Sequence, residues 1–453
     1  MTAATTPSSG IDLAELDPET RPQDDLYRHV NGKWIERTEI PADKARYGSF
    51  AVLAENAEDA VREIITQTEA PAAGAGSSSE AEKVAALYAS FMDVERADAL
   101  GADPILGDLA RALAVGSVAE LVALVGELER EGLGGFYGMF IDNDPGDPNR
   151  YIAFVMQGGL GLPDESYYRE EQFEEVRGQY LAHIERMLEL AKVPGAAEKA
   201  ALSYDLERRI AASHWDKVAS RDIQKLYNLR DFAGLQEITP QLDWSAYLGA
   251  MGAPEDAFAE VVAGQPDALA GLAALLVEDE LPAWRAWLAW ALVRSSASLL
   301  SQEMSRANFE FYGTALTGAT EQRDRWRRGV SFVEGSMGEA VGRLYVERHF
   351  DESAKASMDV LVGHLIEAYR ESILELDWMG ADTQVRAIEK LDKFTPKIGY
   401  PVKWRDYSAL EADAGDLVGN SRRVAVLDFN RELGKLGRPI DRDEWFMTPQ
   451  TVN

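Results

Sequence analysis

The sequence predicts a mainly α-helical fold, because apolar residues recur at helical spacing through most of the 453 residues. Met358, Leu361, Leu365, Tyr369 and Leu376 follow one another at steps of three, four or seven, which places them on one helix face. Hydrophobic residues make up 46% of the chain, enough to fill large cores in two or more domains. We therefore expect a soluble globular protein.

The predicted helices and strands follow a polar N-terminal segment. Residues 1–20 are rich in Thr, Ser, Pro and acidic residues, which predicts a mobile tail. The run 70–79, rich in Ala, Gly and Ser, predicts a flexible surface loop between two helices. Further apolar stripes predict helices within 81–92, 118–128, 173–191, 196–212 and 268–311.

Two short segments interrupt the helical pattern. Residues 135–141 and 151–156 are aromatic and β-branched, and residues 143–149 between them supply Asn, Asp, Gly and Pro. Aromatic and β-branched residues favour strands, and the intervening residues favour a turn. The sequence therefore predicts one small β-hairpin within a helical body.

The charge balance excludes two classes of partner. Asp and Glu number 77 against 46 Lys and Arg, which gives a formal net charge of -31. A surface of this sign repels both phosphate backbones and anionic lipid. We expect no nucleic acid and no membrane surface as partner.

The chain contains no cysteine, which excludes disulfides, thiolate metal sites and cysteine nucleophiles. The first ten residues lack both a basic region and an apolar run, so they do not resemble a signal peptide. The most apolar long stretch, 269–300, is interrupted by five charged residues and is not a membrane span. Together these observations predict a cytoplasmic protein.

No metal ligands are predicted in this chain. The five histidines are His29, His183, His214, His349 and His364, and none lies in a His-Glu-x-x-His motif. That motif places two imidazoles one helical turn apart, so that both reach one zinc ion. Structural or surface positions are the simpler interpretation for all five histidines.

Other motifs also favour structural roles. Residues 313–318 have the glycine spacing of a phosphate loop without its lysine, which favours a loop that ends a helix. Asp164 and Glu165 follow Pro163 and are predicted to begin a helix, where acidic residues suit the helix dipole.

The three-residue spacing of Trp284, Trp287 and Trp290 favours packing between helices over an exposed aromatic surface. Arg343 and Glu347 are one helical turn apart, which predicts an ion pair within one helix.

Separated segments of the chain resemble, in order and spacing, the neprilysin family of zinc metallopeptidases. The similar segments are 21–34, 40–50, 159–168, 311–318, 341–347, 376–379, 390–401 and 441–453. They extend over some four hundred residues. The chain resembles an endothelin-converting-enzyme-like member of this family, and its lack of cysteine fits the family's bacterial branch.

The resemblance implies a multi-helix, cavity-enclosing domain of the neprilysin type over residues 21–401. It implies the first segments of a thermolysin-like catalytic lobe over 402–453, with the family's zinc motif beyond the chain. The complete enzyme would hydrolyse peptide substrates with zinc, a glutamate acting as general base on a zinc-bound water. This chain alone is expected to bind no zinc and to be inactive. It would supply a cavity wall and a substrate-size filter.

Three residues are substrate-binding candidates through the resemblance. Arg37 and Arg46 lie in the segment where similar proteins carry arginines that meet the C-terminal carboxylate of a peptide. A guanidinium can hold a carboxylate with two hydrogen bonds, although an ordinary salt bridge is the alternative for both residues. Asn453 matches a family asparagine whose amide hydrogen-bonds the substrate backbone, which suits its donor and acceptor atoms.

Three hypotheses remain open for the chain as a whole. It is a truncated product or fragment of a complete metallopeptidase, one half of a split peptidase, or a non-catalytic peptide-binding protein. In the first two cases the partner is a catalytic half in the same or a separate chain. Apolar residues of 402–453, among them Val424, Leu427, Phe429 and Phe446, are then expected to lack their covering.

Overall fold

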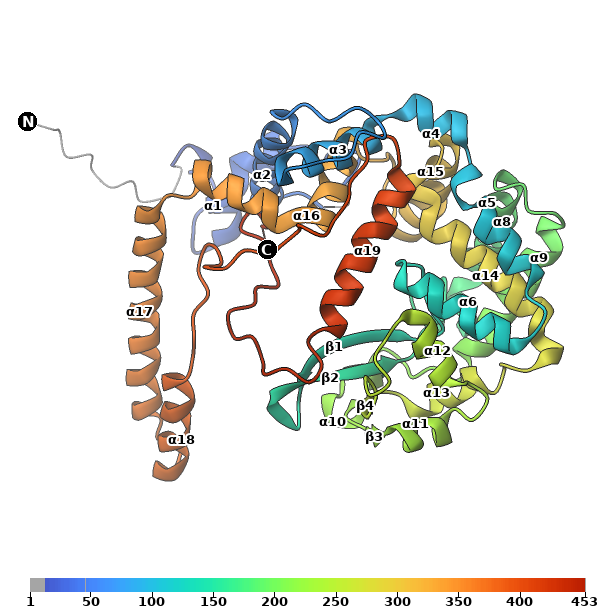
Figure 1. The fold of residues 1–453 in the computed structure, drawn as a ribbon. Coiled ribbons are helices and arrows are strands. Elements are labelled where there is room, and N and C mark those ends of the chain that lie inside the picture. Colours follow the sequence, from blue (N-terminus) through green and yellow to red (C-terminus); the bar gives the residue numbers. More distant parts are fainter. Residues whose placement is uncertain (1–12, 45, 453) are drawn as a thin grey trace, which may run out of the picture.

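The structure is a computed structural model that describes residues 13–44 and 46–452, and it confirms the predicted mainly α-helical fold (Figure 1). The helices are η1 (Leu13–Glu15), α1 (Leu26–Arg37), α2 (Ser49–Thr66), α3 (Glu80–Met92), α4 (Val94–Leu100), α5 (Asp103–Ala114), α6 (Val118–Arg130), α7 (Ser166–Arg169), η2 (Glu171–Phe173), α8 (Glu174–Leu190), α9 (Ala196–Ala211), η3 (Ala219–Arg221), α10 (Ile223–Leu226), α11 (Phe232–Ile238), α12 (Trp244–Met251), α13 (Pro266–Ala273), η4 (Glu278–Glu280), α14 (Leu281–Ser296), η5 (Ala297–Leu299), α15 (Gln302–Phe309), η6 (Glu310–Ala315), α16 (Arg325–His349), α17 (Glu352–Glu375), α18 (Ala381–Asp392) and α19 (Leu417–Leu433).

Capping side chains fix where several helices begin. Ser79 ends the loop predicted at 70–79 and begins α3, since its hydroxyl accepts from the Glu82 amide while the Glu82 carboxylate accepts from the Ser79 amide. Before α7, the Asp164 carboxylate accepts from the Ser166 amide at 2.9 Å, which confirms a helix start there. The loop predicted over 313–318 is wrong for most of that stretch, because residues 313–315 belong to η6 and the helical segment continues to Thr317. Gly318, at φ +79°, ends it.

The predicted hairpin is confirmed but belongs to a larger sheet. β1 (Gly138–Asp144) pairs antiparallel with β2 (Asp147–Met156). Two further strands, β3 (Leu229–Asp231) and β4 (Glu260–Ala263), extend it to a four-stranded sheet of order β1-β2-β4-β3. β4 runs parallel to β2, and β3 runs antiparallel to β4.

The first hydrophobic core surrounds α14, which is buried on nearly every side. Trp284, Trp287 and Trp290 are almost wholly buried, which confirms their predicted packing role. Each indole N–H has a partner: the carbonyl of Leu275 at 2.7 Å, the carbonyl of Gly159 at 2.9 Å, and the hydroxyl of Tyr180 at 2.9 Å, in that order. Burial of these rings therefore leaves no indole donor unpaired.

A second core joins α2, α3 and α16 to the segment 407–424. Tyr407 is buried there, and the ammonium group of the buried Lys83 donates to the Tyr407 carbonyl at 2.9 Å. Val424 of α19 is 8% exposed in this core, while Val418 of the same helix packs into the first. Helix α19 thus belongs to both cores.

The expectation that apolar residues after 402 lack covering is wrong for most of those named. Besides Val424, Leu427 packs against the second core and Phe429 against the first, because α19 lies between the two. Phe446 alone fits the expectation, at 79% exposed.

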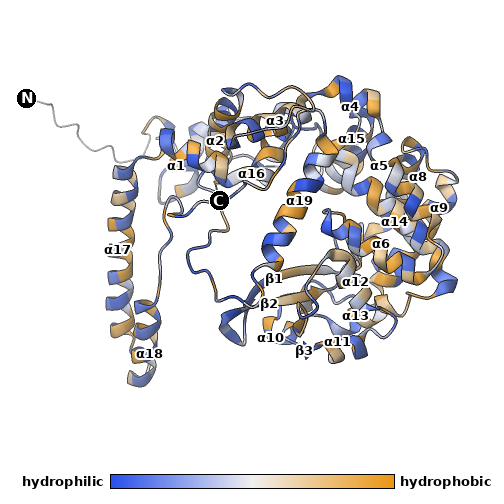
Figure 2. Cartoon of the chain, in the orientation of Figure 1, coloured by the Kyte–Doolittle hydropathy of each residue, from blue (hydrophilic) through white to orange (hydrophobic). Residues whose placement is uncertain are grey.

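The uncovered apolar surface lies instead on α17 and α18. Both helices stand at one side of the body, and neither contains a buried residue (Figure 1). The predicted helix over Met358–Leu376 is confirmed, yet Leu361, Leu365 and Tyr369 on its apolar stripe are all exposed. Figure 2 shows apolar residues along this outlying helix. In α1 only Gly32 is buried, and Leu26 and Tyr27 face outward.

The described residues also bear on the predicted N-terminal tail, on the predicted ion pair of Arg343 and on membrane-spanning helices. Of the tail predicted for residues 1–20, residues 1–12 lie outside the described part, whereas the amide of Asp17 donates to the carbonyl of His29 in α1. The predicted pairing of Arg343 with Glu347 is wrong: the Arg343 guanidinium pairs with Glu80 of α3 at 2.5 Å. No helix in the described ranges has the length and hydropathy to cross a membrane.

Candidate functional site

Helix α16 is kinked at Met337, whose φ of -138° and ψ of 39° depart from helical values. Gly335, Ser336 and Gly338 surround it, and small residues of this kind are a usual cause of helix kinks. The carbonyl of Gly338 accepts a hydrogen bond from the side-chain amide of Gln450 at 3.0 Å. The kink thereby anchors the segment 446–452.

Glycines let this segment approach α16 closely. A Cβ atom added to Gly338 would lie 2.9 Å from Cγ2 of Thr448, and one added to Gly342 would lie 2.8 Å from Cδ of Pro449. Both distances are shorter than side chains tolerate, so larger residues would displace the segment. Gln450 itself is buried.

The segment 446–452 forms one wall of a cavity of about 1120 Å³. The other walls are residues 43–58, which include the start of α2, together with Arg323 and with Glu334 of α16. Its volume is close to that of sites that enclose small ligands, and so it can hold a short peptide segment.

The structure separates the three candidate residues. Arg46 lines the cavity. Arg37 does not line it, and its guanidinium pairs with Glu15. Asn453 lies outside the described residues, although the preceding Val452 lines the cavity.

Most charges at the cavity are paired. The ammonium group of Lys44 lies 2.7 Å from the Glu55 carboxylate, which also accepts from the Tyr47 hydroxyl at 2.7 Å. Burial alone would raise the pKa of Glu55, but these two hydrogen bonds outweigh it and lower that pKa. Glu58 pairs with Arg323 at 2.5 Å and with Arg327.

Two side chains of the cavity have no ion pair with any described residue: Arg46 and Glu334. Burial raises the pKa of Glu334, while hydrogen bonding with the neutral amide of Gln450 lowers it to a smaller extent. The cavity therefore holds one unpaired cation and one unpaired carboxyl group. Arg46 was a candidate through the resemblance, whereas Glu334 follows from no catalytic motif and only the glycine spacing of 335, 338 and 342 in the sequence marks its place.

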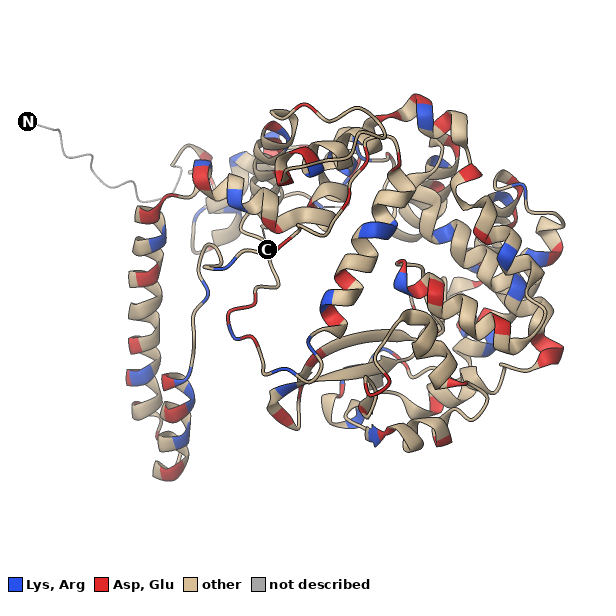
Figure 3. Cartoon of the chain, viewed as in Figure 1, with Lys and Arg blue, Asp and Glu red and all other residues tan. Residues whose placement is uncertain are grey.

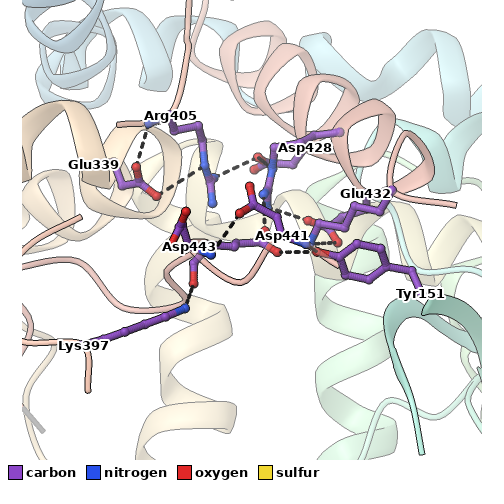
Figure 4. A network of polar contacts seen from close by, with 11 residues as sticks. Tyr151, Glu339, Lys397, Arg405, Asp428, Glu432, Asp441 and Asp443 are labelled. Atoms are coloured by element: carbon purple, nitrogen blue, oxygen red, sulfur yellow. Dashed lines mark hydrogen bonds and ion pairs between the residues drawn. The ribbon is translucent and has the colours of Figure 1, made fainter. Parts of the chain in front are cut away.

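A second cavity of about 730 Å³ is lined by residues of α19, by 403–406 and by residues within 439–445. Figure 3 shows charges of both signs along α19 and the chain after it. Figure 4 shows the polar network there. The Arg405 amide donates to Glu339 of α16 at 2.7 Å, and its guanidinium pairs with Asp428 of α19 at 3.3 Å.

Glu444 is the centre of this network. Its carboxylate lies 2.8 Å from Arg431 and 2.8 Å from Lys435, and its carbonyl accepts from Lys397. Burial would raise the pKa of Glu444, but the two cations lower it overall. The Tyr151 hydroxyl of β2 accepts from the Asp441 amide at 3.0 Å and donates to Glu444. The network thus joins the sheet, α19 and the C-terminal segment.

The described residues offer no metal site: no three His, Asp or Glu side chains among them are placed to hold an ion. The His183 ring stacks on Phe311 with centroids 4.9 Å apart, and burial lowers its pKa to about 4. Burial also lowers the pKa of His214 to about 4, and its Nε2 lies 3.1 Å from the Gly158 carbonyl. These two imidazoles are neutral parts of the packing. The residues present do not fit a zinc ion.

Comparisons with known proteins agree with the resemblance seen in the sequence. A family model described as peptidase family M13 matches residues 22–401. Endothelin-converting enzyme 1 of Rattus norvegicus is 26% identical over 470 residues, which cover 97% of this chain and 60% of that protein. The chain thus spans about 60% of the length of such curated relatives.

Solved structures match over the whole described fold. The zinc metalloprotease Zmp1 of Mycobacterium tuberculosis, in complex with an inhibitor, gives a TM-score of 0.91 at 47% identity, covering 98% of this chain and 67% of that one. PepO from Lactobacillus rhamnosis gives a TM-score of 0.84 at 22% identity, covering 95% and 68% respectively, a likeness of fold.

Proposed function

Because the chain belongs to peptidase family M13, we propose that it forms the N-terminal lobe of a zinc-dependent metalloendopeptidase. In this proposal the chain supplies a wall of the peptide-binding cavity. The observation that carries it is the cavity of about 1120 Å³ in which Arg46 has no acidic partner among the described residues. An unpaired guanidinium in a cavity can bind an anionic group of a ligand.

Arg46 is the proposed contact for the C-terminal carboxylate of a peptide. Of the two arginines named from the sequence, it is the one that lines the cavity. Arg37 is held by Glu15 and would have to break that pair to reach a ligand. Asn453 keeps its proposed role toward the peptide backbone, which the position of Val452 at the cavity supports.

The proposed size filter follows from the dimensions of the cavity. Residues 43–58 and 446–452 bound it on different sides, and the ion pairs of Glu55 and Glu58 fix α2 against its surroundings. A half-open space of about 1120 Å³ admits a few residues of extended peptide and excludes a folded domain. Only peptides of modest size would then reach the site.

The exposed apolar face of α1, α17 and α18 is the proposed contact with the zinc-bearing part. Leu361, Leu365 and Tyr369 are exposed on a helix without a buried residue, whereas soluble proteins normally cover such a stripe. Relatives such as endothelin-converting enzyme 1 extend well beyond the length that this chain matches. The additional part of such a protein, in the same or a separate chain, is the occupant that we propose.

Zinc would be held by that additional part, since the described residues do not fit it. The ion supplies a Lewis acid and an activated water in such peptidases. The residues of this chain bind and orient the peptide and exclude bulk water. We further propose a cytoplasmic location, on the ground that the chain contains no cysteine.

A complementation experiment tests the proposal. The chain is mixed with the portion of the Mycobacterium tuberculosis zinc metalloprotease that it does not match, and cleavage of an internally quenched peptide is followed. We expect a complex in gel filtration and cleavage that a zinc chelator abolishes. Each polypeptide alone, and the mixture with Leu361→Gln and Leu365→Gln in this chain, serve as controls. Complex formation without cleavage would favour the non-catalytic, peptide-binding alternative, and no complex would contradict the proposed contact face.

A further inference from the structure

Glu334 differs from the other carboxylates that line the cavity. Asp43 and Glu55 both contact Lys44, at 3.5 and 2.7 Å, and Glu58 pairs with Arg323 and Arg327. Glu334 has no lysine or arginine within ion-pair distance among the described residues. Its charge is the least compensated of the four, because only the Gln450 hydrogen bond and the field of the more distant Arg323 act against the effect of burial.

The position of Glu334 fixes where an opposite charge would have to lie. It stands one turn before the kink of α16, and the segment held by Gln450 packs beside it. Arg46 belongs to the same cavity but does not pair with it. A ligand that reaches both residues must carry a negative group for Arg46 and a positive group for Glu334.

We propose that Glu334 selects peptides that carry a lysine or arginine side chain, while Arg46 holds their C-terminal carboxylate. This proposal rests on the proposed function, in which the cavity receives a peptide. A charged hydrogen bond in a partly dry cavity is stronger than one in water, so a basic side chain gains affinity there. A lone carboxyl group is too few ligands for a metal cation, and no such group of ligands occurs among the described residues.

The pH dependence supplies an internal check. Because burial raises the pKa of Glu334, the carboxyl group is neutral at a higher pH than an exposed glutamate. The charged groups that act on its pKa are Glu58, which pairs with Arg323 and Arg327 and raises it, and Arg323, which lowers it. The arginine side chains stay charged over the whole pH range of the experiment. The preference for a basic peptide should therefore fall as the pH drops through the raised pKa of Glu334.

The test uses the full chain and two fluorescein-labelled pentapeptides, identical except that one carries lysine where the other carries the uncharged norleucine. Binding is measured by fluorescence anisotropy. We expect the lysine peptide to bind about tenfold more tightly, a difference of about 1.4 kcal/mol. Glu334→Gln should abolish this difference and leave the affinity for the norleucine peptide unchanged. Glu347→Gln, an exposed position on the same helix, is the matched control and should keep the difference.

The outcomes separate the two proposals. If neither peptide binds the wild-type chain, both the proposed peptide-binding function and the proposed selectivity of Glu334 are wrong. If both bind equally, or if the Glu334→Gln chain keeps the preference, the cavity binds peptides but Glu334 does not select them. Should Glu334→Gln fail to fold, the pH series on the wild-type chain decides: a preference for lysine that is constant down to pH 4 contradicts the inference.

Discussion

The side-chain amide of Gln450 donates to the backbone carbonyl of Gly338 across 3.0 Å, so that a residue near the end of the described chain caps the kink of α16. The contact is possible because Gly338 and Gly342 have no side chains in the path of the segment. The segment 446–452, which forms one wall of the candidate cavity, is therefore held by the kink of α16. The same helix contributes Glu334 to another wall.

The close approach at Gly342 predicts a stability cost for any side chain there. In Gly342→Ala the new Cβ would lie 2.8 Å from Pro449 Cδ, which should destabilise the fold by about 1–3 kcal/mol, as overpacking does elsewhere. Urea unfolding followed by circular dichroism measures the change. Gly335→Ala is the control on the same helix, since nothing lies within 4 Å of its added Cβ. Equal stability of the two variants would refute the close contact.

Loss of the Glu444 charge should loosen the polar network. Glu444→Gln removes the ion pairs of this half-buried carboxylate with Arg431 and Lys435, and we expect a loss of about 1.5–3 kcal/mol, because hydrogen bonds to charged groups are among the stronger ones. Thermal unfolding measures it, with Glu371→Gln on exposed α17 as control. An unchanged melting temperature would show that the network contributes nothing to stability.

The same residue predicts how stability depends on pH. The pKa of Glu444 is lower in the folded chain than in the unfolded one. Its contribution is therefore complete above the pKa of an unfolded glutamate and is lost as the pH falls through the lowered, folded value. A series of melting temperatures from pH 7 to pH 3 should decline more steeply for the wild type than for Glu444→Gln. Parallel curves would contradict the assignment.

Arg46 and Arg37 provide a matched pair for carboxylate binding. Arg46→Ala should weaken binding of a peptide with a free C-terminus about tenfold or more, a loss typical of a charged hydrogen bond, and leave an amidated peptide unaffected. Arg37→Ala should change neither affinity, since Arg37 is outside the cavity and paired with Glu15. Fluorescence anisotropy with both peptides makes the comparison. If the two variants had an equal effect, Arg46 would not be the specific contact for the carboxylate.

The exposed face of α17 should make the isolated chain self-associate. Leu361→Gln with Leu365→Gln replaces two exposed apolar side chains without a change in charge, so the melting temperature should hold while association at high concentration declines. Light scattering against concentration measures the association, and Glu371→Gln again serves as control. A lower melting temperature in the double variant would mean that this face packs within the chain.

Local patterns in the sequence predicted the hairpin and several of the helices, because those elements carry their own signals. The spacing of Trp284, Trp287 and Trp290 predicted that α14 packs between helices, although the sequence did not show which helices these are. Strands β3 and β4 were missed because segments of three or four residues are too short to show a period. Only the pairing of β4 with β2, and of β3 with β4, makes them strands.

Partners distant in the sequence could not be predicted. The ion pair of Arg343 with Glu80 spans 263 residues, whereas helical spacing favoured the neighbouring Glu347. The stripe on α17 was recognised as one helix face, but periodicity does not say what covers a face, and here Leu361, Leu365 and Tyr369 remain exposed. The role of Glu334 depends on three walls of one cavity, which only the fold assembles.

The two cores differ in when the growing chain can complete them. The first draws almost entirely on residues 102–311, so its contacts are available as soon as that stretch has been synthesised. The second needs Val61 and Leu87 together with Tyr407 and Val424, and the Asn420 amide reaches the Ser90 hydroxyl across 330 residues. Non-local contacts of this kind close late and slowly. During translation α2 and α3 must therefore wait for α16 to cover part of their apolar faces and for Tyr407 and Val424 to complete the core, which makes this interval the one in which a chaperone would be needed most.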